Sequence, residues 1–230
     1  MKLIVFDLDG TLVDSQHVIV STVRAAFEHF GLPQPADDAI RRIVGLRLVE
    51  GLARLAPALA PDEVVALAEA YRTTFQARRV ASDLTETLFP GVLAMLEALR
   101  DAGFRLGIAT GKSRRGLLSV LERHALADFF VTLQTADLPP GKPHPAMLLR
   151  ALDEAGVAPA EAAMIGDTTF DIAMARAAGA LPIGVAWGYH PPHELTAAGA
   201  VHLVSSSAEL PPLMASLTGT WPLPAGTAGP

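Results

Sequence analysis

The decisive stretch is LIVFDLDGT, residues 3–11. Its first four residues form a short, unbroken apolar run of the kind found in parallel strands that are buried on both faces. The run ends at Asp7, and Asp9 and Gly10 follow within three residues. We therefore predict a buried strand over 3–6 that runs directly into a functional turn.

Strand and helix patterns alternate regularly after residue 90. Proline near the start and glycine after the end mark several of the helices. The predicted strands between them cover 104–109, 129–133, 162–165, 181–185 and 201–204. Repeated strand–helix units of this size predict an α/β fold with a doubly wound parallel sheet.

A helical segment separates the first strand from the others. Apolar residues recur at helical spacing over 18–30, Gly31 closes that helix, and Asp14 or Ser15 is expected to cap its start. Only helical patterns follow as far as residue 83. We predict that 1–14 and 84–217 form the α/β core, that 15–83 form an inserted all-helical cap, and that the Gly-, Pro- and Thr-rich residues 218–230 form a loosely held tail.

Length and composition narrow the classes of function. The 230 residues fit one core domain with an inserted subdomain. The formal net charge is −6 and no basic run occurs, which argues against a nucleic-acid partner. The absence of cysteine excludes disulfides, thiolate metal sites and cysteine nucleophiles. No signal peptide or membrane span is recognised, so we expect a cytoplasmic protein without a membrane partner.

Polar groups follow four of the predicted strands. Ligands of open parallel sheets bind beyond the carboxyl ends of the strands, so these groups are expected to meet. Each alone is no more than an ordinary turn or helix cap, but together they predict one cluster of carboxylates, a hydroxyl and a lysine. The groups are Asp7 to Thr11, Thr110-Gly111-Lys112, Gly141-Lys142-Pro143, and Gly166-Asp167 with Asp171.

This combination resembles the haloacid dehalogenase superfamily of phosphatases, whose four motifs occur here in the family's order over nearly the whole chain. The resemblance implies a Rossmann-like core in which Asp7 is the nucleophile and forms an aspartyl phosphate. It implies that Asp9 protonates the leaving alcohol and then activates water. It also implies that the Thr110 hydroxyl holds a phosphoryl oxygen and that the Lys142 ammonium keeps Asp7 ionised.

The resemblance further implies a magnesium ion as cofactor. Asp7, the Asp9 carbonyl and Asp167 would bind Mg²⁺, and Asp171 would order its waters or Lys142 from outside this shell. A second set of residues is expected around the substrate and its phosphate: Gly10, Thr11, Gly111, Lys112 and, from the cap, Arg47.

The reaction implied is hydrolysis of a small phosphomonoester, phosphoglycolate-like or a sugar phosphate, by a monomer or homodimer whose cap closes over the site. Asp9 argues against a dehalogenase, and the lack of lysine between Lys2 and Lys112 argues against a phosphonatase. A β-phosphoglucomutase-like mutase remains an alternative, although such relatives usually lack Thr11, and a pyrophosphatase is a further one. A phospho-accepting signalling module is the alternative from another class, and the insertion counts against it.

Overall fold

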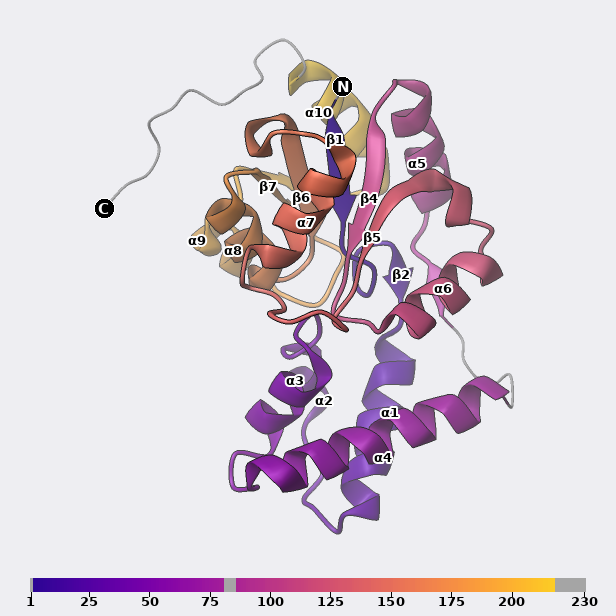
Figure 1. Cartoon of the computed structure of the whole chain (residues 1–230), viewed down its shortest axis with the longest axis vertical. Helices are drawn as coiled ribbons and strands as arrows, with labels where there is room; N and C mark the ends of the chain where they lie inside the picture. The colour runs from indigo at the N-terminus through magenta and orange to yellow at the C-terminus, as the bar shows by residue number, and fades with distance from the viewer. Residues whose placement is uncertain (1, 81–85, 218–230) are drawn as a thin grey trace.

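Six parallel strands form the central sheet of the computed structural model, which describes residues 2–80 and 86–217 (Figure 1). β1 lies in the middle of the sheet, where Leu3 is paired with Arg105 on one side and with Ala162 on the other. All four β1 residues are fully buried, which explains why the strand is apolar throughout rather than alternating. The strands in spatial order are β5 (Phe130–Gln134), β4 (Arg105–Ala109), β1 (Leu3–Phe6), β6 (Ala162–Gly166), β7 (Leu181–Val185) and β8 (His202–Val204).

Helices cover both faces of this sheet. One apolar cluster joins it to α5 (Val92–Asp101), α6 (Arg114–Arg123) and α10 (Leu210–Leu217). A second cluster joins its other face to α7 (Ala146–Ala155) and α8 (Thr169–Ala178). The prediction of a doubly wound α/β fold is confirmed. Around the sheet there are also α9 (Pro192–Ala198) and the 3₁₀ turns Ala127–Phe129, Pro159–Glu161 and Ser207–Glu209.

The predicted helical insertion is also present. It contains α1 (Gln16–His29), α2 (Asp37–Arg41), α3 (Leu48–Leu55) and α4 (Pro61–Val80), which lie together beyond the carboxyl edge of the sheet (Figure 1). These helices share an apolar cluster of their own, separate from the two clusters of the sheet. The predicted domain limits stay predictions, because residues 81–85 and the predicted tail 218–230 lie outside the described residues.

Two short strands carry the chain across between the sheet and the insertion. β2 (Val13–Asp14) and β3 (Thr87–Leu88) pair antiparallel, with Val13 opposite Leu88 and Asp14 opposite Thr87. The sequence does not predict this ribbon, because two residues are too few to show a period. Because β2 and β3 are paired, the two segments in which the chain passes between the sheet and the insertion lie side by side.

The helices differ from membrane-spanning segments. Over 2–80 and 86–217, no helix has both the length and the apolar character that a bilayer span requires.

Candidate active site

The polar groups predicted from the sequence meet at the carboxyl edge of the sheet. Asp7 follows β1, Thr110 follows β4 and Asp167 follows β6, while Lys142 lies in the loop after β5. All four side chains are buried. Carboxylate oxygens of Asp7, Asp167 and Asp171 all lie within 4.8 Å of one another. The parallel arrangement of the strands therefore gathers residues that are far apart in the sequence into one site.

Lys142 bridges two of the carboxylates. Its Nζ lies 2.8 Å from Asp7 Oδ1 and 2.6 Å from Asp171 Oδ1. Burial lowers the pKa of Lys142, but the charges of Asp171 and Asp7 outweigh this effect and raise it above the usual value. The lysine is therefore an ammonium that carries one positive charge into a group of three acids.

Asp171 also stabilises the start of α8. Its Oδ2 accepts hydrogen bonds from the backbone N–H of Thr168 (3.0 Å) and from the Thr168 hydroxyl (2.7 Å). The first of these bonds is one half of a capping box, whose other half joins the Thr168 side chain to the backbone N–H of Asp171. Both of its oxygens thus have partners within the protein. Asp171 therefore contacts Lys142 directly, and its role in ordering this lysine stays a prediction.

The carboxylate group has the properties of a cation site. Asp7 Oδ1 accepts from the backbone N–H of Leu8 (2.7 Å), whereas Asp7 Oδ2 is buried without a partner among the described residues. Burial raises the pKa of Asp7 well above its usual value, and burial together with the charge of Asp171 raises the pKa of Asp167 to about 7. Lys142 balances only one of the three negative charges, so an oxygen-preferring divalent cation fits here.

Gly10 and Thr11 pack against Asp167. Gly10 has φ +87°, and a Cβ at this position would overlap the Asp167 carboxylate, so both the backbone and the space require glycine. The Thr11 hydroxyl donates to Asp167 Oδ1 (2.8 Å), and the backbone N–H of Tyr189 donates to Oδ2 (2.9 Å). The sequence led us to expect Gly10 and Thr11 around the phosphate; in this structure they hold Asp167.

Asp9 belongs to a separate buried network. Its Oδ1 accepts from the Ser15 hydroxyl (2.6 Å) and from Lys112 Nζ (2.9 Å). Lys112 Nζ also lies 3.1 Å from Glu86 Oε1, and Glu86 in turn pairs with Arg123. Burial lowers the pKa of Lys112, but Asp9 and Glu86 raise it further, so the lysine remains charged.

This network differs from what the sequence led us to expect. Lys112 is predicted to lie around the phosphate, and the structure shows in addition that it pairs with Asp9. Ser15 is the N-cap residue of α1, as expected, but its hydroxyl bonds to Asp9 and does not cap the helix. Glu86 is not found from the sequence at all, because one acidic residue in a connecting segment carries no signal.

The α2–α3 loop of the insertion packs onto the loops that hold the motifs. A Cβ on Gly111 would lie 2.6 Å from the Leu46 carbonyl oxygen and 2.7 Å from that of Gly45. The Arg47 side chain packs across Gly141, and its Nε donates to the carbonyl of Ala136 (3.3 Å). Arg47 also pairs with Glu50 (3.3 Å), so in this structure it binds protein groups at the edge of the site.

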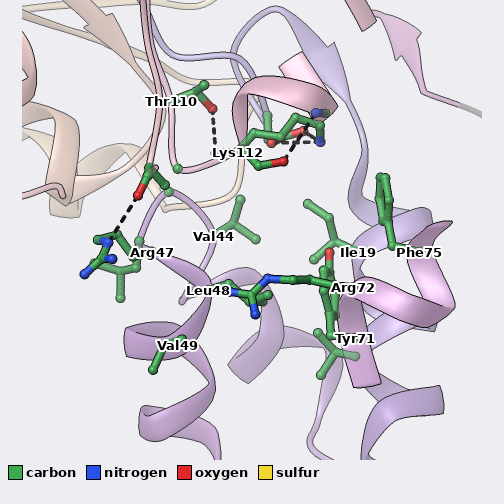
Figure 2. Close-up of a pocket in the computed structure, with 18 of the residues that line it drawn as sticks. Ile19, Val44, Arg47, Leu48, Val49, Tyr71, Arg72, Phe75, Thr110 and Lys112 are labelled. Carbon is green, nitrogen blue, oxygen red and sulfur yellow. Dashed lines mark hydrogen bonds and ion pairs between the residues drawn. The ribbon is translucent and has the colours of Figure 1, made fainter. Parts of the chain in front are cut away.

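A cavity of about 690 Å³ lies between the sheet edge and the insertion. Asp7, Asp9, Thr110, Gly111 and Lys112 line its sheet side. Thr110 and Lys112 are labelled in Figure 2. The side chains on its other side come mainly from the insertion and, except for Arg47, are not identified from the sequence. They include Ile19, Val44, Leu48, Val49, Tyr71, Arg72 and Phe75.

The fold and the site define a capped α/β enzyme with a carboxylate cluster at the edge of its sheet. Residues 4–185 match the family model of haloacid dehalogenase-like hydrolases. The chain belongs to this family, which confirms the resemblance found in the sequence.

Two relatives and one solved structure are similar to this chain over nearly its full length. The chain is 37% identical to a phosphoglycolate phosphatase from Chromobacterium violaceum, with 93% of this chain and 96% of that protein covered. It is 36% identical to "Probable phosphatase IndB" from Dickeya dadantii, with 90% and 91% covered. A haloacid dehalogenase-like hydrolase structure from Bacteroides fragilis superposes with a TM-score of 0.83 at 31% identity, covering 91% of this chain and 99% of that one.

Proposed function

We propose that the protein is a Mg²⁺-dependent phosphatase that hydrolyses a small phosphomonoester through an aspartyl phosphate on Asp7. The observation that carries this proposal is the state of the Asp7 carboxylate. One oxygen is anchored by Lys142 and the Leu8 N–H, while the other is buried without a partner among the described residues and belongs to a residue that lines the cavity. An anchored carboxylate with one free oxygen can act as a nucleophile or bind a cation.

The roles of the neighbouring residues follow from their contacts. As an Asp7 oxygen bonds to phosphorus, the bond from phosphorus to the ester oxygen breaks, and Asp9 gives that oxygen a proton. Lys142 keeps Asp7 ionised and offsets negative charge on the transferring group. The Thr110 oxygen accepts from the backbone N–H of Lys112 (3.1 Å), so its hydroxyl hydrogen is left to donate to a phosphoryl oxygen. Water then attacks phosphorus while Asp9 takes its proton, which releases phosphate and restores Asp7.

Asp7, Asp167 and the Asp9 carbonyl would hold the magnesium ion. When bound, Mg²⁺ neutralises charge on the phosphate oxygens and helps to orient the substrate. The raised pKa values of Asp7 and Asp167 support such a site, because a nearby dication would favour their ionised forms.

Phosphate release with and without Mg²⁺ tests the proposal. We expect turnover that EDTA abolishes and Mg²⁺ restores, and we expect Asp7→Asn to lose turnover and the phosphoenzyme while it still binds substrate. Asp153→Asn, an exposed change of the same type on α7, is the matched control and should retain full activity. Undiminished activity in Asp7→Asn would contradict the mechanism. Conversion of β-glucose 1-phosphate to glucose 6-phosphate without net phosphate release would instead identify a mutase.

A further inference from the structure

The cavity is large for a two-carbon substrate. Its volume of about 690 Å³ lies within the range of roughly 300–1,000 Å³ in which proteins bind drug-sized ligands. Phosphoglycolate would occupy the end near Thr110 and Gly111 and leave most of the remaining space to water. The size of the cavity therefore favours a phosphate ester with a bulkier alcohol.

The walls supplied by the insertion are largely apolar and partly aromatic. Ile19, Val44 and Leu48 line the cavity together with the rings of Tyr71 and Phe75 (Figure 2). The two rings lie one helical turn apart on α4 and stack with centroids 6.1 Å apart and planes inclined by 23°. These apolar and aromatic side chains stabilise an apolar or flat ligand body, whereas a small hydrophilic acid gains nothing from them.

The aromatic wall adjoins the group that would protonate the leaving oxygen. Lys112 Nζ, the partner of Asp9, lies 5.5 Å from the centroid of the Phe75 ring. A ring attached near the ester oxygen would consequently reach Phe75 while its phosphate remains at Asp7. The geometry thus joins the phosphate end and the aromatic wall within one ligand-sized space.

Two polar groups on α4 stand beside this wall. The Tyr71 hydroxyl points toward the side of the cavity that holds Lys112 (Figure 2). Burial raises the pKa of Tyr71, so the hydroxyl keeps its hydrogen and can both donate and accept. Arg72 also lines the cavity, and its ion pair with Glu69 (3.1 Å) is half-exposed and therefore weakly held. These groups can recognise polar atoms on a ring.

We propose, resting on the phosphatase function above, that the substrate is the phosphomonoester of an alcohol that carries a flat ring. Its phosphate binds at Asp7, Thr110 and Gly111, and its ring lies against Phe75 and Tyr71. The Tyr71 hydroxyl and Arg72 bind polar atoms at the edge of the ring.

Phosphate release should be compared between esters with and without a ring, with saturating Mg²⁺. The ring-bearing set is nucleoside 5′-monophosphates, pyridoxal 5′-phosphate and 1-naphthyl phosphate; the other is phosphoglycolate, glycerol 3-phosphate and pyrophosphate. We expect the best ring-bearing ester to exceed every ringless one in kcat/KM by at least about tenfold. If a ringless compound is turned over best, the inference fails and the phosphatase stands. If no compound in either set releases phosphate, the proposed function itself fails.

A change in the wall gives a second readout. Phe75→Leu keeps the position apolar but removes the ring, and we expect the ratio of kcat/KM for the best ring-bearing ester to that for phosphoglycolate to fall by about two- to tenfold, mainly through KM. Where the ring-bearing ester is an alkyl phosphate like phosphoglycolate, as pyridoxal 5′-phosphate and the nucleotides are, effects on Asp9 or Lys112 are common to both substrates and largely cancel in this ratio. Phe75→Tyr keeps the ring and should keep the wild-type ratio. Val65→Ala, at a position on the same helix that is 53% exposed, should also leave the ratio unchanged. An unchanged ratio in Phe75→Leu would overturn the inference.

Discussion

The residues of this site fall into two groups with different tasks. In the proposed mechanism Asp7 and Lys142 act at the reacting centre. Thr11 and Ser15 donate hydrogen bonds to Asp167 and Asp9, and Asp171 forms an ion pair with Lys142. Groups of buried like charges are unfavourable for stability unless they are paired, so their presence here reflects the requirements of the reaction. Lys112 has two possible roles: the sequence predicts that it lies around the phosphate, and the structure pairs it with Asp9.

Replacement of Lys112 distinguishes these two assignments. We expect Lys112→Met to lower kcat by about 100-fold with a small change in KM, because Asp9 loses the contact that fixes its position. We also expect it to lower the free energy of unfolding by about 3–5 kcal/mol, since Asp9 and Glu86 would remain buried without their shared cation.

Steady-state kinetics and urea unfolding measure these effects. Lys112→Arg keeps the charge and should retain more activity than Lys112→Met. A large rise in KM with kcat unchanged would show that Lys112 binds the phosphate, as the sequence alone suggests.

At the scale of elements, the α2–α3 loop links the insertion to the site. The backbone of Gly45 and Leu46 approaches Gly111 closely, and the Arg47 side chain lies across Gly141. Glycines in two different sheet-edge loops thus make room for the same segment. This contact is part of how the insertion is seated over the cavity.

Enlarging Gly111 tests the importance of this contact. We expect Gly111→Ala to push the α2–α3 loop away, because its Cβ would lie far inside the contact distance to two carbonyl oxygens. The expected result is a fall in kcat/KM of about 10- to 100-fold.

A matched glycine gives the control for that change. Gly31 has φ +63°, and a Cβ added there would have nothing within 4 Å, so Gly31→Ala should cost stability, about 1–2 kcal/mol, and leave kcat/KM intact. If kcat/KM fell equally in Gly111→Ala and Gly31→Ala, the loss could not be attributed to the contact between Gly111 and the α2–α3 loop, which would contradict this prediction.

The elements that the sequence predicted well are those with long apolar runs or glycine stops. The strands over 3–6 and 181–185 have the predicted bounds. Three others differ by one residue at one end, and the strand predicted over 129–133 lies one residue later, at Phe130–Gln134. The β2–β3 ribbon, the Asp9–Lys112 pair and the aromatic wall were not predictable in the same way. They depend on tertiary approach and on side-chain conformation, which a periodic pattern does not encode. Phe75 and Tyr71 read simply as apolar helix residues until the fold turns them toward the cavity.

The whole molecule contains separate apolar clusters joined by a narrow connection. Ile19, Phe27 and Leu67 belong to the cluster of the insertion, and Tyr189 is a residue of the α/β core that packs against it. The paired β2 and β3 strands carry both chain crossings. This arrangement lets each part keep its own packing while the site is formed between them.

The stability of the whole molecule should depend on pH and Mg²⁺ through the carboxylates. The pKa of Asp167 rises from its ordinary 3.8 to about 7 in the folded protein. Between these values the folded state keeps a proton that the unfolded state releases, so without metal the free energy of unfolding falls as pH rises from about 4 to about 7. Mg²⁺ prefers the ionised carboxylates and should therefore stabilise the protein more at pH 8 than at pH 5.

Thermal unfolding in EDTA and in Mg²⁺ checks this expectation. At about 100 times Kd the gain is about 2.7 kcal/mol, which corresponds to a rise in Tm of roughly 5–10 °C for a protein of this size. Asp167→Asn should remove the Mg²⁺ effect and raise the Tm of the metal-free protein at pH 8. The same Mg²⁺ effect at both pH values would contradict the assignment.

The central place of β1 in the sheet has a consequence for synthesis. β1 precedes both of its partner strands in the chain, and Leu3 pairs with Arg105 and Ala162. At about 5–20 residues per second, the ribosome delivers the second of these partners roughly 8–30 s after β1. The helices of the insertion, being contiguous, are complete long before then. Asp7 therefore acquires its neighbours late, and a nascent chain has its cap before it has an active site.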